Sequence, residues 1–97
     1  MSLNPEQRRT TADEFTENLS RAGLTLEQAQ ARSSLSEQRF SAAISVSPDA
    51  HPVDVWAVRD LLEDLVEEAG GTSVEHSVLN DKARSAAQVW FGIPDKD

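Results

Sequence analysis

The sequence predicts an all-α protein, a single orthogonal bundle of five helices. Apolar residues recur at the three- and four-residue spacing of amphipathic helices, most clearly between residues 52 and 69. Residues that typically begin and end helices separate these segments from one another. The 97 residues suit one domain, and no stretch approaches the roughly 20 apolar residues of a membrane span.

The first helix is expected to begin at Thr10 or Thr11, because a glutamate follows Thr11 at capping-box spacing. Gly23 is expected to end it, since glycine adopts the left-handed backbone conformation without a steric penalty. Residues 1–9 are then expected to form a flexible N-terminal arm. Residues 10–97 are expected to form the single helical domain.

Two short helices joined by a tight turn are expected next, and they make residues 25–45 a helix-turn-helix candidate. Thr25 is the expected cap of the first helix and Ser36 of the second, because a hydroxyl can accept a hydrogen bond from a free backbone N–H. Leu35 and Phe40 have the spacing of a hydrophobic staple around the second cap.

The fourth helix is the clearest element, with Pro52 in its first turn and Gly70 at its end. Residues 72–79 alternate weakly between apolar and polar side chains. Because one short strand is not stable alone, this segment is expected to lie on the core as a loop or to pair with a second copy. A fifth helix is expected to begin at Asn80 or Asp81.

The net charge of −8 is unevenly distributed along the chain. Residues 1–46 hold five arginines against six acidic residues, a balance of −1, whereas residues 47–97 hold four basic against eleven acidic residues, a balance of −7. The acidic C-terminal half would repel a phosphate backbone. The nearly neutral first half therefore contains whatever DNA surface the chain has.

If the second short helix reads DNA, its N-terminal side chains enter the major groove. The expected base-reading residues are Glu37, Gln38, Arg39 and Ser41. The expected phosphate contacts are Arg21, Gln28, Gln30 and Arg32.

The segment GLTLEQAQARSSLSEQRFSAAI, residues 23–44, resembles the Cro/C1-type (phage-repressor-like) helix-turn-helix. That family often has glutamine, alanine and glycine spaced by three residues across the turn, where this chain has Leu26, Gln30 and Ser34. The glutamine that commonly touches phosphate is therefore replaced, and Glu37 opens the reading helix with a charge that phosphates repel.

The whole chain also resembles a family of small uncharacterised bacterial proteins. The resemblance rests on GLT-x-EQ at 23–28, VW-x-x-RD-x-LE at 55–63 and AR-x-AAQ-x-WFG at 83–92. It implies a lambda-repressor-like helical domain with an added C-terminal helix.

Two functions from different classes remain open. The first is a DNA-binding transcriptional regulator, expected to be a homodimer on double-stranded DNA. The second is an acidic protein-interaction module on the same scaffold that has lost DNA binding. A continuous positive face through Arg21, Arg32 and Arg39 would favour DNA, and a neutral or acidic face would favour a protein partner.

No enzymatic activity, cofactor or metal site is expected. The chain has no cysteine, its two histidines lack neighbouring ligands, and no nucleophile or phosphate-loop motif is present. Because no apolar stretch follows the two arginines near the N-terminus, no secretory signal is expected. A cytoplasmic location, away from membranes, is then the expected one.

Overall fold

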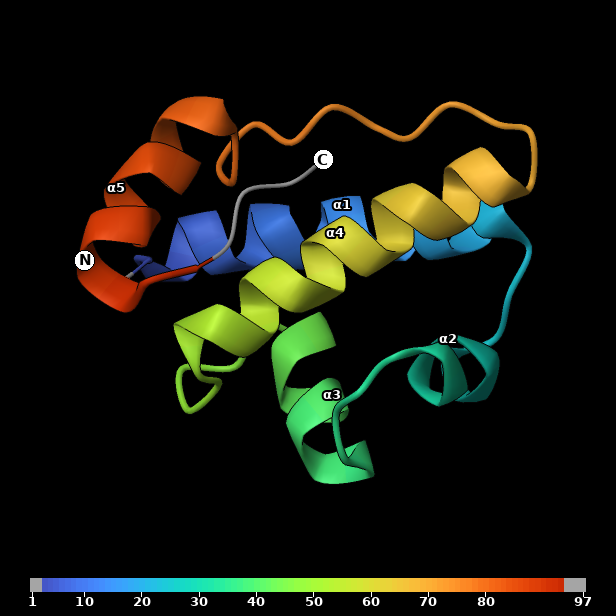
Figure 1. Ribbon diagram of the computed structural model, residues 1–97, viewed down its shortest axis with the longest axis horizontal. Helices are drawn as coiled ribbons and strands as arrows, with labels where there is room; N and C mark the ends of the chain where they lie inside the picture. The colour runs from blue at the N-terminus through green and yellow to red at the C-terminus, as the bar shows by residue number, and fades with distance from the viewer. Residues whose placement is uncertain (1–2, 94–97) are drawn as a thin grey trace.

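The computed structural model describes residues 3–93. They form five helices: α1 (Pro5–Ala22), α2 (Leu26–Arg32), α3 (Glu37–Ile44), α4 (Pro52–Glu68) and α5 (Asp81–Phe91), shown in Figure 1. The described residues include no strand, so the predicted five-helix all-α bundle is confirmed. Every helix within this range is too short or too polar to cross a membrane.

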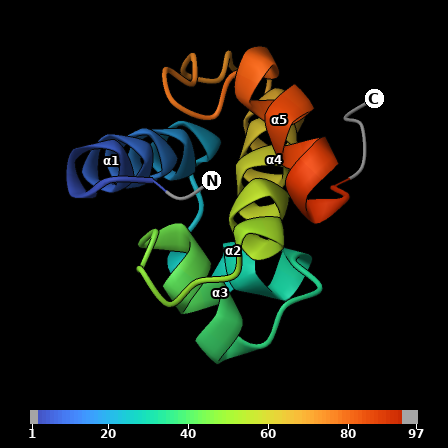
Figure 2. The ribbon, with the colours of Figure 1, turned by 90° about the vertical axis from the view of Figure 1, so that its left-hand side faces the viewer.

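The core lies between the two long helices, α1 and α4, which run side by side (Figures 1 and 2). Phe15 of α1 and Val58, Leu62 and Val66 of α4 are the largest apolar side chains that solvent does not reach. Their spacing of four residues along α4 places them on one stripe of that helix. The apolar pattern that predicted this helix therefore forms the centre of the core.

The first helix begins earlier than the sequence indicated. The backbone N–H of Gln7 donates to Asn4 Oδ1 (2.8 Å) and the N–H of Asn4 donates to Gln7 Oε1 (3.0 Å), which together form a capping box. Pro5 occupies the first turn, where its missing N–H costs nothing. The expected start at Thr10 or Thr11 is therefore wrong, and residues 5–9 of the expected arm are helical; Met1 and Ser2 lie outside the described residues.

The two short helices α2 and α3 pack beneath the long pair, and α3 crosses α4 steeply (Figure 1). The expected caps are confirmed: Gln28 N–H donates to Thr25 Oγ1 (3.1 Å), and Arg39 N–H donates to Ser36 Oγ (3.3 Å). Residues 33–36 join the two helices. The chain between Gly23 and Ile44 thus forms two helices with a corner rather than one continuous helix.

α3 ends without a glycine. Val46 takes the left-handed conformation (φ 52°), which is unusual for a β-branched residue. Its N–H donates to the carbonyl of Ala43, the N–H of Ser47 donates to that of Ala42, and the Val46 side chain is buried. Burial of this side chain helps to offset the strain of its backbone.

Residues 69–80 connect α4 to α5, and the part from residue 72 returns along the length of the long helices (Figure 1). They are irregular, so the expected loop lying on the core is found, and a strand is not. α5 comes close to the other helices at few points and lies at one end of the molecule (Figures 1 and 2). It packs chiefly through small side chains.

Candidate functional site

The corner between α2 and α3 is held by side chains that the sequence also assigned to DNA. Gln30 Nε2 donates to the carbonyl oxygen of Leu35 (3.1 Å), and Ser33 Oγ donates to the carbonyl oxygen of Gln30 (2.7 Å). Gln28 is engaged only through its side-chain oxygen, which accepts from the N–H of Thr25 (2.9 Å). Both glutamines therefore stabilise the corner region, and Gln30 does so with the amide group that a phosphate would need.

Arg21 and Arg32 lie at the surface, each joined to a carboxylate. Arg21 Nε donates to Glu17 Oε2 (3.0 Å), and a terminal nitrogen donates to the carbonyl of Thr72 (2.9 Å). Arg32 Nη2 contacts both carboxylate oxygens of Glu68, at 3.0 and 2.8 Å. The charge of each arginine is thus balanced from within the molecule.

Arg39 makes the tightest of these ion pairs. Its Nε donates to Asp54 Oδ2 (2.9 Å) and its Nη2 to Oδ1 (2.6 Å), a bidentate arrangement that links α3 to the first turn of α4. The Asp54 side chain is only 5% exposed, whereas that of Arg39 is 61% exposed. The hydrogen bond to Asp54 raises the pKa of Arg39 above its ordinary value.

Three of the predicted base-reading residues remain available on α3. Glu37, Gln38 and Ser41 are exposed, and their side chains make no hydrogen bond to any residue within 3–93. The structure therefore brings the expected reading face to the surface. Its one cation, Arg39, is directed into an internal ion pair.

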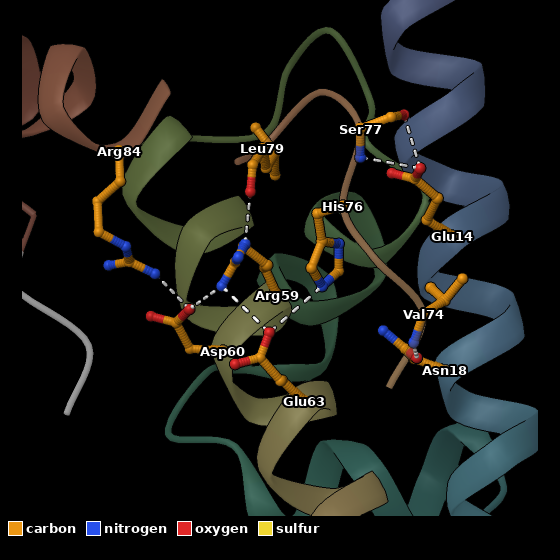
Figure 3. Close-up of polar contacts among 10 residues, drawn as sticks. All are labelled: Glu14, Asn18, Arg59, Asp60, Glu63, Val74, His76, Ser77, Leu79 and Arg84. Carbon is orange, nitrogen blue, oxygen red and sulfur yellow. Dashed lines mark hydrogen bonds and ion pairs between the residues drawn. The ribbon is translucent and has the colours of Figure 1, made fainter. Parts of the chain in front are cut away.

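A second polar cluster ties the connection before α5 to the long helices (Figure 3). Asp60 Oδ1 accepts from Arg59 Nη1 (2.8 Å) and also from Arg84 of α5. Arg59 is buried, and its Nε donates to the carbonyl oxygen of Leu79 (2.7 Å). The guanidinium groups of Arg59 and Arg84 lie 5.5 and 4.8 Å from the ring centre of Trp56, which fixes the position of that indole.

His76 is the most enclosed titratable group in this cluster, with its side chain only 2% exposed. Its Nε2 lies 3.8 Å from Glu63 Oε2, and its ring meets that of Phe15 edge to face at 6.2 Å. Burial, and next the positive charge of Arg59, lower the pKa of His76, although nearby carboxylates oppose the shift. A substrate in solution cannot reach this ring, so the cluster fits a structural role.

Hydrogen bonds to α1 secure the same segment. Asn18 Oδ1 accepts from the N–H of Val74 (2.7 Å), and Glu14 Oε2 accepts from both the N–H and the hydroxyl of Ser77 (3.1 and 2.7 Å), as Figure 3 shows. The buried Asn18 Nδ2 and both His76 ring nitrogens have no hydrogen-bond partner in the described structure. Among residues 3–93, no group of three or more histidine and acidic side chains is placed to hold a metal ion.

Sequence reasoning missed the carboxylates that neutralise the helix-turn-helix. Nothing in the sequence indicated that Asp54 pairs with Arg39 or that Glu68 pairs with Arg32. Both partners lie far from their arginines along the chain, 15 residues for Asp54 and 36 for Glu68. No local spacing signals such pairs.

The family model described as "Uncharacterized protein conserved in bacteria (DUF2316)" matches residues 1–92. The comparisons with curated proteins and with solved structures gave no match.

Proposed function

The chain belongs to the bacterial family DUF2316, and we propose that it is an interaction module whose helix-turn-helix binds a protein rather than duplex DNA. One observation carries the proposal. Arg21, Arg32 and Arg39, the arginines expected to face DNA, are each closed onto a carboxylate of the same molecule.

Charge is the first support for a protein partner. DNA affinity depends on cations that neutralise phosphates and release counterions. Residues 23–44 contain two arginines and two glutamates, a balance of zero, and the paired carboxylates on α1 and α4 add negative charge around them. A DNA complex would therefore form without net electrostatic attraction from these residues and with repulsion from the surrounding carboxylates.

The three ion pairs differ in how easily DNA could break them. The pairs of Arg21 and Arg32 are exposed on both sides, and such pairs contribute about 0–1 kcal/mol each. Arg39 is different, because its release would leave the buried Asp54 carboxylate without its partner. The arginine best placed on α3 to read a base is therefore the least free to do so.

An apolar side chain gives the second support. Leu26 is 55% exposed at the start of α2, the position where the Cro/C1-type pattern has its phosphate-touching glutamine. Burying apolar surface against a protein contributes about 25 cal/mol per Å². A phosphate group offers no such gain.

DNA binding by a helix-turn-helix regulator is the second candidate function. It is favoured by Gln38 and Ser41, which are exposed along α3 and are not used internally within the described structure, whereas Glu37 beside them opposes it by its charge. Glutamine can bond adenine in the major groove, with about 1–3 kcal/mol of discrimination.

A titration of the protein against a pool of duplexes at low salt separates the two functions. The proposal predicts no salt-dependent binding even at about 10 μM protein, a concentration far above the dissociation constants of specific DNA regulators. Saturable binding that weakens with salt would overturn it. In that case Gln38→Ala should alter base preference, and Arg32→Ala should lower the salt slope by about 1.

A photo-crosslinking residue at Gln38 tests the protein partner directly, in cells that contain the protein's natural partners. The matched control carries the same residue at Ser85, which is exposed on α5 at the other end of the molecule. A discrete protein adduct from position 38 alone supports the proposal. An adduct with nucleic acid from position 38, or identical adducts from both positions, contradicts it.

A further inference from the structure

An apolar cavity of about 330 Å³ lies between α5, the starts of α1 and α4, and the connection from α3 to α4. Its walls include Val46, Pro48, Val55, Trp56, Ala87 and Trp90. The volume falls at the lower end of the range of small-molecule sites, roughly 300–1,000 Å³.

The cavity exists because α5 presents small side chains to the bundle. Ala83, Ala86 and Ala87 recur at helical spacing on the face of α5 that lines the cavity. Their methyl groups leave space that larger side chains would fill, and α5 comes close to the other helices at few points. Trp90 also lines the cavity, and this residue is 69% exposed. The apolar wall of the cavity therefore reaches the protein surface at this side.

One charged residue lines this cavity. Arg8 of α1 contributes its side chain, and its Nη1 donates to the carbonyl oxygen of Leu3 (2.7 Å). Within residues 3–93, no carboxylate lies within ion-pairing distance of Arg8, whereas Arg21, Arg32 and Arg39 each have one. Among the described residues of this protein of net charge −8, Arg8 is therefore a cation at an apolar cavity without a balancing anion.

We propose that the cavity binds a small amphipathic anion, a free medium-chain carboxylate, with its apolar chain among the alanines of α5 and its carboxylate on Arg8. The guanidinium has donors left beyond the one on Leu3, so it can bind a carboxylate without losing that contact. The apolar walls provide the burial that drives binding of the chain. This site is independent of what the helix-turn-helix binds.

Intrinsic fluorescence reports occupancy, because Trp56 and Trp90 are the chain's two tryptophans and both line the cavity. Titration with decanoate below its micelle concentration should give a saturable change in tryptophan emission. Octanoate, two methylenes shorter, should bind about fifteenfold more weakly, since each buried methylene contributes roughly fourfold in affinity. Decanol, which lacks the charge, should also bind at least tenfold more weakly.

The matched variants are Arg8→Gln and Arg9→Gln. Arg9 is exposed, lies outside the cavity wall and has no carboxylate within 4.0 Å among the described residues, so it controls for net charge. Arg8→Gln should weaken decanoate at least tenfold and leave decanol unchanged, whereas Arg9→Gln should change neither. Ala86→Leu, which fills the cavity, should abolish the response while the far-ultraviolet circular dichroism stays that of the native protein.

Three results would overturn the proposal. The first is the lack of a saturable response to decanoate. The second is an equal loss of binding in Arg8→Gln and Arg9→Gln, which would indicate attraction to charge in general. The third is a tryptophan shift that depends on protein concentration without any ligand, which would mean that a second copy covers this face.

Discussion

Arg39 and Asp54 join α3 to α4 through two parallel hydrogen bonds, with the carboxylate buried and the guanidinium at the surface. The pair fixes how α3 sits against α4. It also gives Arg39, a predicted DNA contact, a structural role between two helices.

Arg39→Ala should lower the urea midpoint, because the buried Asp54 carboxylate would lose its bidentate partner. Urea unfolding followed by circular dichroism measures the change. Gln38→Ala, next to it on the exposed side of α3, should stay within about 0.5 kcal/mol of the parent protein. Equal stabilities of the two variants would show that the ion pair contributes little.

Asp60→Asn should lower the free energy of unfolding by about 1–3 kcal/mol, since Arg59 and Arg84, both buried, share its carboxylate. The matched control is Glu67→Gln, an exposed acid on the same helix, which should have little effect. Thermal unfolding of the two variants at the same pH compares them. A Glu67→Gln variant as unstable as Asp60→Asn would argue against this account of the cluster.

Asn4→Ala should cost about 1 kcal/mol, the usual contribution of a side-chain helix cap. The variant should lower the local stability of the first turn of α1 as well as the free energy of unfolding of the whole protein, because this turn depends on the cap. Hydrogen exchange should therefore speed up most at the amides of residues 7–9, while α4 keeps its relative protection. Unchanged exchange at those amides would contradict the capping box.

Stability should fall as the pH drops below about 6.5, and His76 should account for part of the loss. Its pKa is lowered in the folded state, chiefly by burial, while the unfolded histidine titrates near 6.5. As the pH falls below about 6.5, the unfolded chain therefore binds the proton more readily than the folded chain does. The contribution of the neutral His76 to stability is fully present only above this pH.

Urea midpoints at about pH 7.5 and pH 5.5 test this dependence. His76→Gln should reduce the difference between the two midpoints. An identical pH dependence in the two proteins would show that His76 does not titrate in this range.

Local patterns predicted most of the fold. The caps at Thr25 and Ser36 and the helix end at Gly23 depend on neighbouring residues, and the structure confirms them. The family match confirms the resemblance to a bacterial family; its Cro/C1-type part stays a prediction. The predicted start of α1 is wrong because Asn4 and Gln7 form a capping box seven residues before the one that the spacing of Thr11 and Glu14 indicates.

The surface chemistry could not be predicted in the same way. Arg39 and Asp54 meet only because α3 packs against α4, and Gln30 turns inward because the corner needs a donor for the carbonyl of Leu35. The left-handed Val46 gives no signal in sequence, since glycine is the residue usually found in that conformation. Such contacts follow from the packing, which no single segment specifies.

The placement of the two indoles has a consequence for how unfolding can be followed. The chain has no tyrosine, so near-ultraviolet absorption and emission come almost entirely from one end of the molecule, where Trp56 of α4 and Trp90 of α5 line the same cavity. An optical signal there would report the detachment of α5 even while α2 and α3 stayed folded. A two-state treatment therefore requires that this signal and the backbone signal change together.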